Sequence, residues 1–283
     1  MSGAVEVHHR SDGPVAGSPL VLAASLGTDL GVWEQQVPML ARYLRVIRYD
    51  ARGHGRSPVP PGPYSLADLG ADLIGLLDRL GIARADVCGL SIGGAAAMWV
   101  AAHAPQRVGR LILICSSAWF SAEVYAQQAE RVRRDGLGPI VDAVVGRWFT
   151  PAFAARRPEA VAAARSMLLA TPVEGYAASC EALATIDLQP DLWRIVAPTL
   201  IVAGADDLAV PGDHPRRLAS AIAGSRLAVV PSAAHLANVE QPQAVAALMA
   251  THLGIDGLDG LDGLDDGDGT DGSDGSGSLE VTG

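Results

Sequence analysis

Residues 85–94, ADVCGLSIGG, place a serine between two glycines at the end of an apolar run. The small-residue stretch AAAMWVAAHA follows, with the composition of a buried helix. The pattern G-x-S-x-G between a strand and a helix is typical of a nucleophile elbow, a sharp turn that lifts a serine hydroxyl above a sheet. Ser91 is therefore the candidate nucleophile. The alternative is a tight structural turn in which Gly89 and Gly93 only prevent clashes.

Short apolar runs alternate with longer helical patterns on both sides of this segment. The alternation favours an α/β fold with a mostly parallel sheet flanked by helices. Residues 118–192 interrupt it with an Ala- and Arg-rich stretch, which predicts a helical cap inserted between two strands. The predicted divisions are 1–117 (core, first part), 118–192 (helical cap), 193–254 (core, second part) and 255–283 (disordered Gly/Asp-rich tail). The predicted strands cover residues 5–9, 20–24, 45–50, 85–90, 110–115, 199–204 and 226–231.

An acid and a histidine follow the serine in the order that a triad on such a sheet requires. The pair Asp206 and Asp207 comes directly after the predicted strand at 199–204, and His235 comes after the strand at 226–231. Consecutive strand ends deliver side chains to one edge of a parallel sheet, so these residues can meet Ser91. Asp207 is the preferred acid because it stands four residues before Pro211, as the acid usually does in the enzyme family that several segments quoted below resemble, and Asp206 remains the alternative.

An oxyanion hole needs two backbone N–H donors, one from the residue after the nucleophile and one from a loop after an early strand. Ile92 supplies the first. The loop ASLGTD at 24–29 follows the strand at 20–24, and alignment of this loop places Leu26 as the second donor. A glycine turn at Gly27 is the simpler explanation of the loop, and it is compatible with the donor role.

The composition excludes several other chemistries. All 21 basic residues are arginines, and without a lysine amine neither Schiff-base nor P-loop chemistry is possible. Nine of the 31 acidic residues lie in residues 256–283, which leaves 22 acidic against 21 basic residues in the rest of the chain. The body is nearly neutral, so we expect neither a nucleic acid nor a membrane as partner. The three scattered cysteines, and a start without a signal-peptide pattern, predict a reduced, cytoplasmic protein.

Several segments together resemble the α/β-hydrolase superfamily, and in particular the 3-oxoadipate enol-lactonases of aromatic catabolism. They are LAASLGTDLGVWEQQ, IRYDARGHGRS, GLSIGG, the acid loop, HLANVEQP and, in the predicted cap, VVGRWFTPAF. The resemblance covers residues 15–252 and implies a serine hydrolase that opens a carboxylated enol lactone without any metal or organic cofactor. It also implies that Trp148 forms a wall of the substrate pocket.

The carboxylate of such a substrate calls for a cation, and the cap offers Arg131, Arg133, Arg134 and Arg147, of which Arg133 is the chosen candidate. The lactonase pattern leads us to expect an arginine a few residues beyond Tyr125, where this chain has Gln128. Some relatives are fused to a carboxymuconolactone decarboxylase, so a functional link to that enzyme is expected. Another esterase, lactonase or cofactor-free perhydrolase and a non-catalytic binding protein are the alternatives.

Overall fold

A computed structural model describes residues 3–255 and 280–282 of the chain. Within these residues one eight-stranded sheet forms the centre of the molecule, in the order β1-β3-β2-β4-β5-β6-β7-β8. The edge strands β1 and β8 run antiparallel to their neighbours and the other pairs are parallel. The strands are β1 (His9–Asp12), β2 (Ser18–Ala23), β3 (Leu44–Tyr49), β4 (Ala85–Leu90), β5 (Val108–Ile114), β6 (Thr199–Gly204), β7 (Arg226–Val230) and β8 (Glu280–Thr282).

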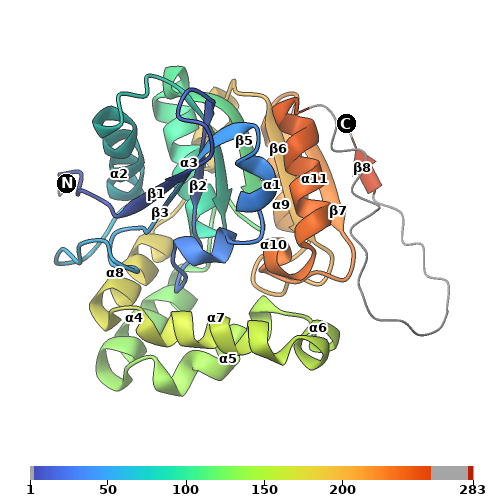
Figure 1. Cartoon of the computed structure of the whole chain (residues 1–283). Coiled ribbons are helices and arrows are strands. Elements are labelled where there is room, and N and C mark those ends of the chain that lie inside the picture. The colour runs from blue at the N-terminus through green and yellow to red at the C-terminus, as the bar shows by residue number, and fades with distance from the viewer. Residues whose placement is uncertain (1–2, 256–279, 283) are drawn as a thin grey trace, which may run out of the picture.

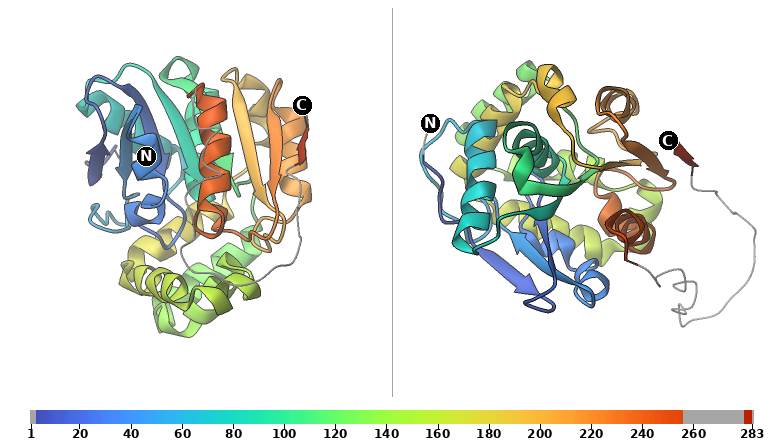
Figure 2. Two further views of the ribbon diagram at one scale, coloured as in Figure 1. Left: turned by 45° about the vertical axis from the view of Figure 1, so that its right-hand side comes forward. Right: turned by 90° about the horizontal axis from the view of Figure 1, so that it is seen from above.

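Helices cover both faces of the sheet (Figures 1 and 2). On one face lie α2 (Leu66–Arg79), α3 (Ile92–His103) and α9 (Asp213–Ala221), and on the other lie α1 (Val37–Leu40) and α11 (Pro242–Leu253). The Ala-rich sequence of α3 leaves ten of its twelve residues buried, which suits a helix at the centre of a sheet face. The predicted fold class, an α/β-hydrolase fold, is confirmed.

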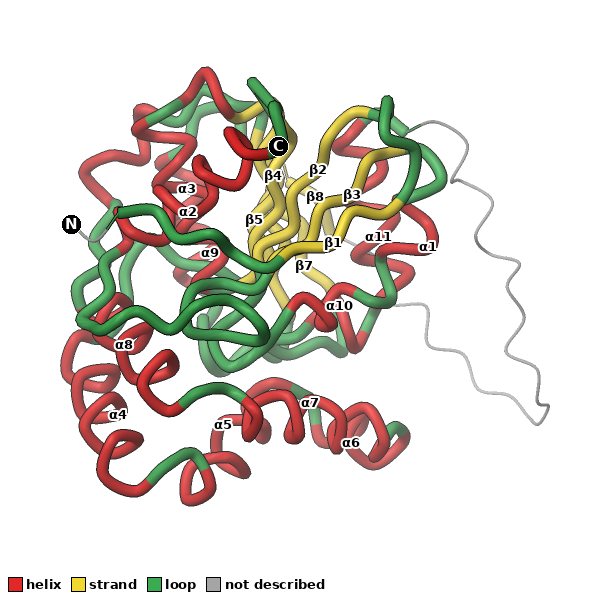
Figure 3. Tube along the Cα trace, turned by 60° about the vertical axis from the view of Figure 1, so that its left-hand side comes forward, coloured by secondary structure: helices red, strands yellow, loops and turns green. Residues whose placement is uncertain are grey.

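The part of the chain that connects β5 to β6 forms a layer of helices, which lies across the carboxyl ends of the strands (Figures 1 and 3). This layer falls within the predicted cap of residues 118–192. Within this layer, α4 (Ala122–Asp135) and α8 (Val173–Ala184) are far apart in the chain but pack side by side. The helices of the layer are α4 (Ala122–Asp135), α5 (Val141–Trp148), α6 (Pro151–Arg156), α7 (Pro158–Ala170) and α8 (Val173–Ala184).

The strand order reverses at β2, and this reversal positions the site. Strand β2 lies between β3 and β4, so the chain leaves β2 and β4 in opposite directions and a crevice opens between the two loops. Ala23 pairs with Gly89 in the register of these strands. Leu26 and Ile92 each lie three residues beyond that pair, so the two loops meet at the carboxyl edge of the sheet.

The first strand was predicted wrongly. Residues 5–8 are not in the sheet, and β1 begins at His9. Side chains hold the backbone there instead: Val5 N–H donates to Asp72 at 2.8 Å and His8 N–H donates to Ser57 Oγ at 2.8 Å. The apolar alternation of residues 5–8 therefore reflects the burial of Val7 and does not indicate a strand of the sheet.

The C-terminal tail also departs from its prediction where it is described. Glu280–Thr282 forms β8, which pairs antiparallel with β7, so the disordered tail predicted for 255–283 is wrong at these residues. A strand at the edge of a sheet exposes unpaired N–H and C=O groups that a further segment can satisfy. Ile255 is also described, and the remainder of the predicted tail lies outside the described residues. No described helix has both the length and the apolar character needed to span a bilayer.

A first prediction concerns the close approach of α3 to β2. A Cβ atom at Gly93 would lie 2.5 Å from the carbonyl oxygen of Ala23 and 2.6 Å from that of Ala24. We therefore expect Gly93→Ala to lower the free energy of unfolding by about 1–3 kcal/mol, measured by urea denaturation. The control is Gly146→Ala in α5, where a Cβ meets no atom within 4 Å. An equal loss for both variants would contradict the steric explanation.

Candidate active site

Ser91 occupies the turn between β4 and α3 in a conformation that few serines adopt. Its backbone has φ 55° and ψ −119°, in a region that non-glycine residues rarely occupy. Three backbone contacts hold this turn: Ser91 N–H donates to Ile114 O at 2.9 Å, and Ser91 O accepts from Ala95 N–H at 3.1 Å and from Ser116 Oγ at 2.7 Å. The elbow geometry predicted from G-x-S-x-G is present.

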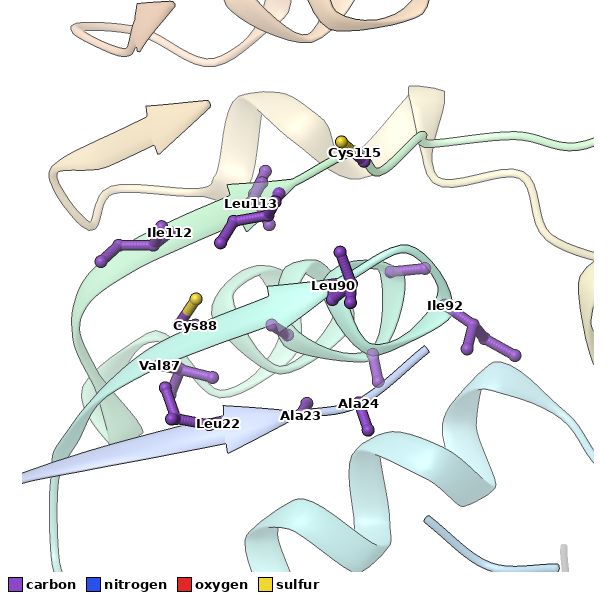
Figure 4. Close-up of a cluster of buried hydrophobic side chains, with 14 of the residues drawn as sticks. Leu22, Ala23, Ala24, Val87, Cys88, Leu90, Ile92, Ile112, Leu113 and Cys115 are labelled. Atoms are coloured by element: carbon purple, nitrogen blue, oxygen red, sulfur yellow. The ribbon is translucent and has the colours of Figure 1, made fainter. Parts of the chain in front are cut away.

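Both glycines of the motif are required because a side chain at either position would clash with the backbone. A Cβ atom at Gly89 would overlap the carbonyl group of Gly93, and one at Gly93 would overlap the carbonyl oxygens that end β2. The start of α3 therefore lies directly against the end of β2, in the region where Figure 4 labels Ala23, Ala24 and Ile92. The turn needs both glycines whether or not Ser91 reacts, so the motif alone does not establish catalysis.

Two backbone amides are available beside Ser91. Ile92 is the first residue of α3, and Leu26 lies in the loop after β2. Neither amide has a hydrogen-bond acceptor within residues 3–255 and 280–282. Leu26 and Ser91 line one pocket, and Ile92, which lines an adjoining cavity, directly follows Ser91 in the chain. An anion that develops on a substrate carbonyl could therefore accept hydrogen bonds there, assisted by the dipole of α3.

His54, from the RGHGRS segment, supports the loop that carries Leu26. Gly27 N–H donates to His54 Nε2 at 3.0 Å, and His54 Nδ1 lies 3.1 Å from Arg52 O. Because Nε2 accepts and Nδ1 faces a carbonyl oxygen, the ring is neutral with its proton on Nδ1. Burial lowers the pKa of His54 below its usual value, although the Arg52 carbonyl and the Asp50 carboxylate act in the opposite direction.

Asp207 and His235 form a buried pair at the same edge of the sheet. His235 Nδ1 lies 3.0 Å from Asp207 Oδ2, and Asp207 Oδ1 accepts from the amides of Ala209 at 2.8 Å and Val210 at 3.0 Å. Burial alone would raise the pKa of Asp207, but His235 and these two amides lower it overall. A carboxylate at Nδ1 leaves the His235 Nε2 lone pair free to accept a proton.

The structure distinguishes the two candidate acids. Asp206 is exposed and has no side-chain hydrogen bond or ion pair among the described residues, whereas Asp207 holds His235. His235 and Ser91 line one pocket, without a direct hydrogen bond between their side chains in the described structure. In unliganded hydrolases this contact is often long, and it shortens when substrate is bound.

The histidine loop is tied to the cap. The buried carboxylate of Glu240 accepts from Thr150 N–H at 2.5 Å and from Ala234 N–H at 2.6 Å. In addition, Leu236 N–H donates to Trp148 O at 3.0 Å. Leu236 is thus bonded directly to the end of α5, and Ala234 is linked to Thr150 of the cap through Glu240, so cap and histidine loop hold each other in place.

The pocket over Ser91 lies between core and cap. The core contributes Leu26, Ser91, His235, Ser25 and Ala209. The cap contributes both apolar and polar walls: Tyr125, Gln128, Val144, Arg147, Trp148, Tyr176 and Leu183.

The predicted carboxylate ligand, Arg133, is not in this pocket. It lies on α4, and its guanidinium forms ion pairs with Glu181 and, at 2.7 Å, with Glu174 on α8. Arg133 therefore links two cap helices at the surface, and its assignment as a substrate contact is corrected. The arginine that lines the pocket is Arg147, one residue before Trp148.

Arg147 has no acceptor for its guanidinium among the residues that the structure describes. Its charge acts on the phenols of Tyr125 and Tyr176, which face the same space. Burial raises the pKa of Tyr125 to about 12, so its hydroxyl stays neutral. Gln128, which stands where an arginine was expected, donates to Tyr176 OH at 2.6 Å.

Sequence reasoning missed Ser25 and Tyr176. Ser25 precedes Leu26 in the oxyanion loop, so its position in that loop could have indicated it. Tyr176 lies on α8 within an Ala-rich stretch that matches no motif, and only the packing of α8 against α4 brings it to the pocket. No local signal in the sequence indicated it.

Comparisons with known proteins agree with this geometry. The family model described as alpha/beta hydrolase fold matches residues 18–242. The chain is 41% identical to 3-oxoadipate enol-lactonase 2 of Acinetobacter baylyi, over 85% of this chain and 90% of that protein. It is 30% identical to a putative carbamate hydrolase, RutD, of Stutzerimonas stutzeri, over 88% of this chain and 95% of that protein. The crystal structure of the enol-lactonase from Burkholderia xenovorans superposes with a TM-score of 0.86 at 40% identity, covering 88% of this chain and 96% of that one.

The fold and the comparisons together define a carboxylic-ester hydrolase. The chain belongs to the α/β-hydrolase family, and the predicted resemblance to 3-oxoadipate enol-lactonases is confirmed.

A second prediction tests which acid holds His235. Asp207→Asn keeps the shape of the side chain but replaces a carboxylate, which only accepts hydrogen bonds, by an amide that can donate one to His235 Nδ1. We therefore expect kcat for ester hydrolysis to fall about 10⁴-fold. Asp206→Asn is the matched control because its side chain is exposed, and we expect it to behave as wild type. Steady-state kinetics on a chromogenic ester measures both. A loss in Asp206→Asn with an active Asp207→Asn would reverse the assignment.

A third prediction concerns pH. The folded-state pKa of His54 is lowered from 6.5, so as pH falls below about that value the unfolded chain binds a proton that the folded chain does not. The free energy of unfolding should therefore decrease as pH falls, with His54 contributing at most about 1.4 kcal/mol per pH unit. Urea denaturation at several pH values should show a shallower decrease for His54→Gln than for wild type. His103→Gln, at an exposed site, should follow wild type.

Proposed function

We propose that the chain is a serine hydrolase that opens a carboxylated enol lactone, 3-oxoadipate enol-lactone, to 3-oxoadipate. The observation that carries this proposal is one pocket that contains Ser91, His235 and Arg147, a cation with no acidic partner in the described part of the chain. The first two can break an ester bond, and the third can hold a second, unreacting carboxylate. The similarity to named enol-lactonases supports the same substrate.

In the proposed mechanism His235 Nε2 takes the proton of Ser91 Oγ while Oγ attacks the lactone carbonyl carbon. The charge that develops on the carbonyl oxygen is stabilised by the amides of Leu26 and Ile92. Collapse of this intermediate breaks the ring C–O bond, and His235 returns its proton to the enol oxygen, which then tautomerises to a ketone. Asp207 stabilises the imidazolium form of His235 throughout.

Water completes the reaction. His235 removes a proton from a water molecule that attacks the acyl group on Ser91, and the second collapse releases a free carboxylate and restores the Ser91 hydroxyl. Every step uses a side chain or amide of this chain, so the proposed mechanism needs no cofactor. The proposed product places the protein in aromatic catabolism, with a functional link to carboxymuconolactone decarboxylase, and a cytoplasmic location is part of the same proposal.

Trp148 and Arg147 give the pocket its proposed selectivity. Trp148 is 4% exposed and its ring forms part of the wall opposite the core, where it can pack against the lactone ring. Arg147 is partly buried beside the neutral phenols of Tyr125 and Tyr176, so few other groups compete for its charge. A substrate carboxylate that binds Arg147 would fix the lactone carbonyl over Ser91.

A second candidate function is hydrolysis of another ester or of a carbamate on the same triad. The 30% identity to a putative carbamate hydrolase favours this alternative, and an esterase with a neutral substrate would use the same core. The two candidates differ in their need for Arg147. A neutral ester or carbamate has no carboxylate for the guanidinium, whereas the enol lactone does.

The fourth prediction separates these candidates by kinetics on the enol lactone and on p-nitrophenyl acetate. For Arg147→Gln we expect KM for the lactone to rise about 10- to 100-fold, the equivalent of one hydrogen-bonded charge pair, with little change for the neutral ester. The matched control is Arg133→Gln, which removes an arginine that pairs with Glu174 and Glu181 at the cap surface. It should leave both substrates unaffected.

Fast turnover of the ester with an inert lactone would contradict the lactonase assignment and favour the alternative. Labelling by a fluorophosphonate probe tests the hydrolase itself. Wild type should be labelled at Ser91, and Ser91→Ala should not. The absence of labelling in a folded wild-type protein would instead indicate a non-catalytic binding protein.

A further inference from the structure

A buried cysteine lies behind the proposed triad. Cys115 follows β5, and its Sγ, a carboxylate oxygen of Asp207 and a ring nitrogen of His235 all lie within 4.8 Å of one another. All three residues are buried. Figure 4 shows Cys115 at the end of β5, beyond Leu113 and close to the turn between β4 and α3. Three different ligand atoms thus face one small volume.

The backbone at Cys115 brings its thiol toward the acid and histidine loops. Cys115 has φ 46°, in the left-handed region that residues with a side chain seldom adopt. Its N–H donates to Val202 O on β6 at 2.8 Å, and its thiol donates to Ala234 O at 3.7 Å. Ala234 immediately precedes His235, so the thiol contacts the backbone that carries the proposed base.

We propose that Cys115, Asp207 and His235 bind a borderline or soft divalent cation such as Zn²⁺ or Cd²⁺, and that the bound cation inactivates the enzyme. Thiolate, imidazole nitrogen and carboxylate oxygen are the ligands that zinc takes in proteins. Atoms at the corners of a triangle with 4.8 Å sides lie about 2.8 Å from its centre. Zinc bonds measure about 2.0–2.3 Å, so small side-chain movements bring the three atoms to bonding distance, and water can fill the fourth position.

The charges of the site balance when the cation binds. The Cys115 thiol donates a hydrogen bond to Ala234 O, so it carries a proton before the cation enters. Binding forms one metal–sulfur bond and releases this proton to solvent. The Cys115 thiolate and the Asp207 carboxylate then neutralise the two charges of the cation, so no net charge is buried.

The same event removes the base. A cation between Asp207 and His235 takes the Nδ1 lone pair, and the proton of His235 moves from Nδ1 to Nε2. Asp207 Oδ2 then bonds to the cation, while Oδ1 keeps its hydrogen bonds from the amides of Ala209 and Val210. With a proton on Nε2, His235 has no lone pair to accept the proton of Ser91. The inactivation therefore rests on the proposed function, whereas binding of the cation does not.

Cd²⁺ added to the purified full chain tests both parts. Binding is followed by the ultraviolet absorbance of the cadmium–thiolate bond, and the reactivity of Ser91 by fluorophosphonate labelling. In wild type we expect the absorbance to appear, labelling to be lost, and a chelator to reverse both. In Cys115→Ser the absorbance should be absent, and at least about tenfold more Cd²⁺ should be needed to suppress labelling.

Controls keep the test specific. Cys180→Ala removes another buried cysteine, on α8, and should behave as wild type. Cys115→Ala is a second variant without the thiol and should match Cys115→Ser, with circular dichroism reporting the fold of each. Equal sensitivity of wild type and both Cys115 variants would overturn the proposed site.

Two further outcomes separate this proposal from the proposed function. A cadmium–thiolate signal that depends on Cys115 while labelling of Ser91 persists would overturn the inactivation. If wild type is never labelled, even without Cd²⁺, the serine hydrolase function fails, and a signal that depends on Cys115 would still support the cation site.

Discussion

The left-handed backbone conformation of Ser91 is the constraint on which the site depends. A residue with φ 55° costs conformational energy unless its surroundings determine it, and here β5, Ser116 just after β5 and α3 each hold the turn by a hydrogen bond. The strain lets α3 begin immediately against the end of β2. That close approach brings the amides of Leu26 and Ile92, which have no acceptor among the described residues, to the same edge of the sheet as Ser91. The strained turn therefore prepares both a nucleophile and a site for an anion.

A second constraint joins the cap to the core. The Glu240 carboxylate receives hydrogen bonds from Thr150 in the cap and from Ala234 beside the proposed base, and the pKa of this buried acid is raised by desolvation. A buried acceptor that lost either donor would leave an unsatisfied polar group, which costs about 1–3 kcal/mol. Movement of the cap away from the core therefore acts on the loop of His235 as well as on the walls of the pocket.

The sequence predicted the features that depend on local pattern and chain order. The elbow, the acid and the histidine follow successive parallel strands, and parallel strands deliver their carboxyl ends to one edge. Choosing Asp207 over Asp206 required knowing which carboxylate turns inward, which the offset to Pro211 only indicated. Arg133 could not be separated from Arg147 in the same way. Both lie on cap helices, and only the packing of α4 on α8 shows that Arg133 already has acidic partners.

The division of roles between core and cap explains why one fold can serve several ester hydrolases. Attack on a carbonyl needs a nucleophile, a base and two amides, and the core provides these without contacting the rest of the substrate. Recognition of a distant carboxylate needs a cation that is not already paired and is partly shielded from water. An arginine in the cap meets this need only when the nearby acids do not pair with it, as at Arg147, where Asp142 of the same helix pairs with Arg165 at 3.1 Å. Substrate range in this architecture therefore follows from the ion pairs that cap helices make with one another, because each such pair removes one arginine from the pocket.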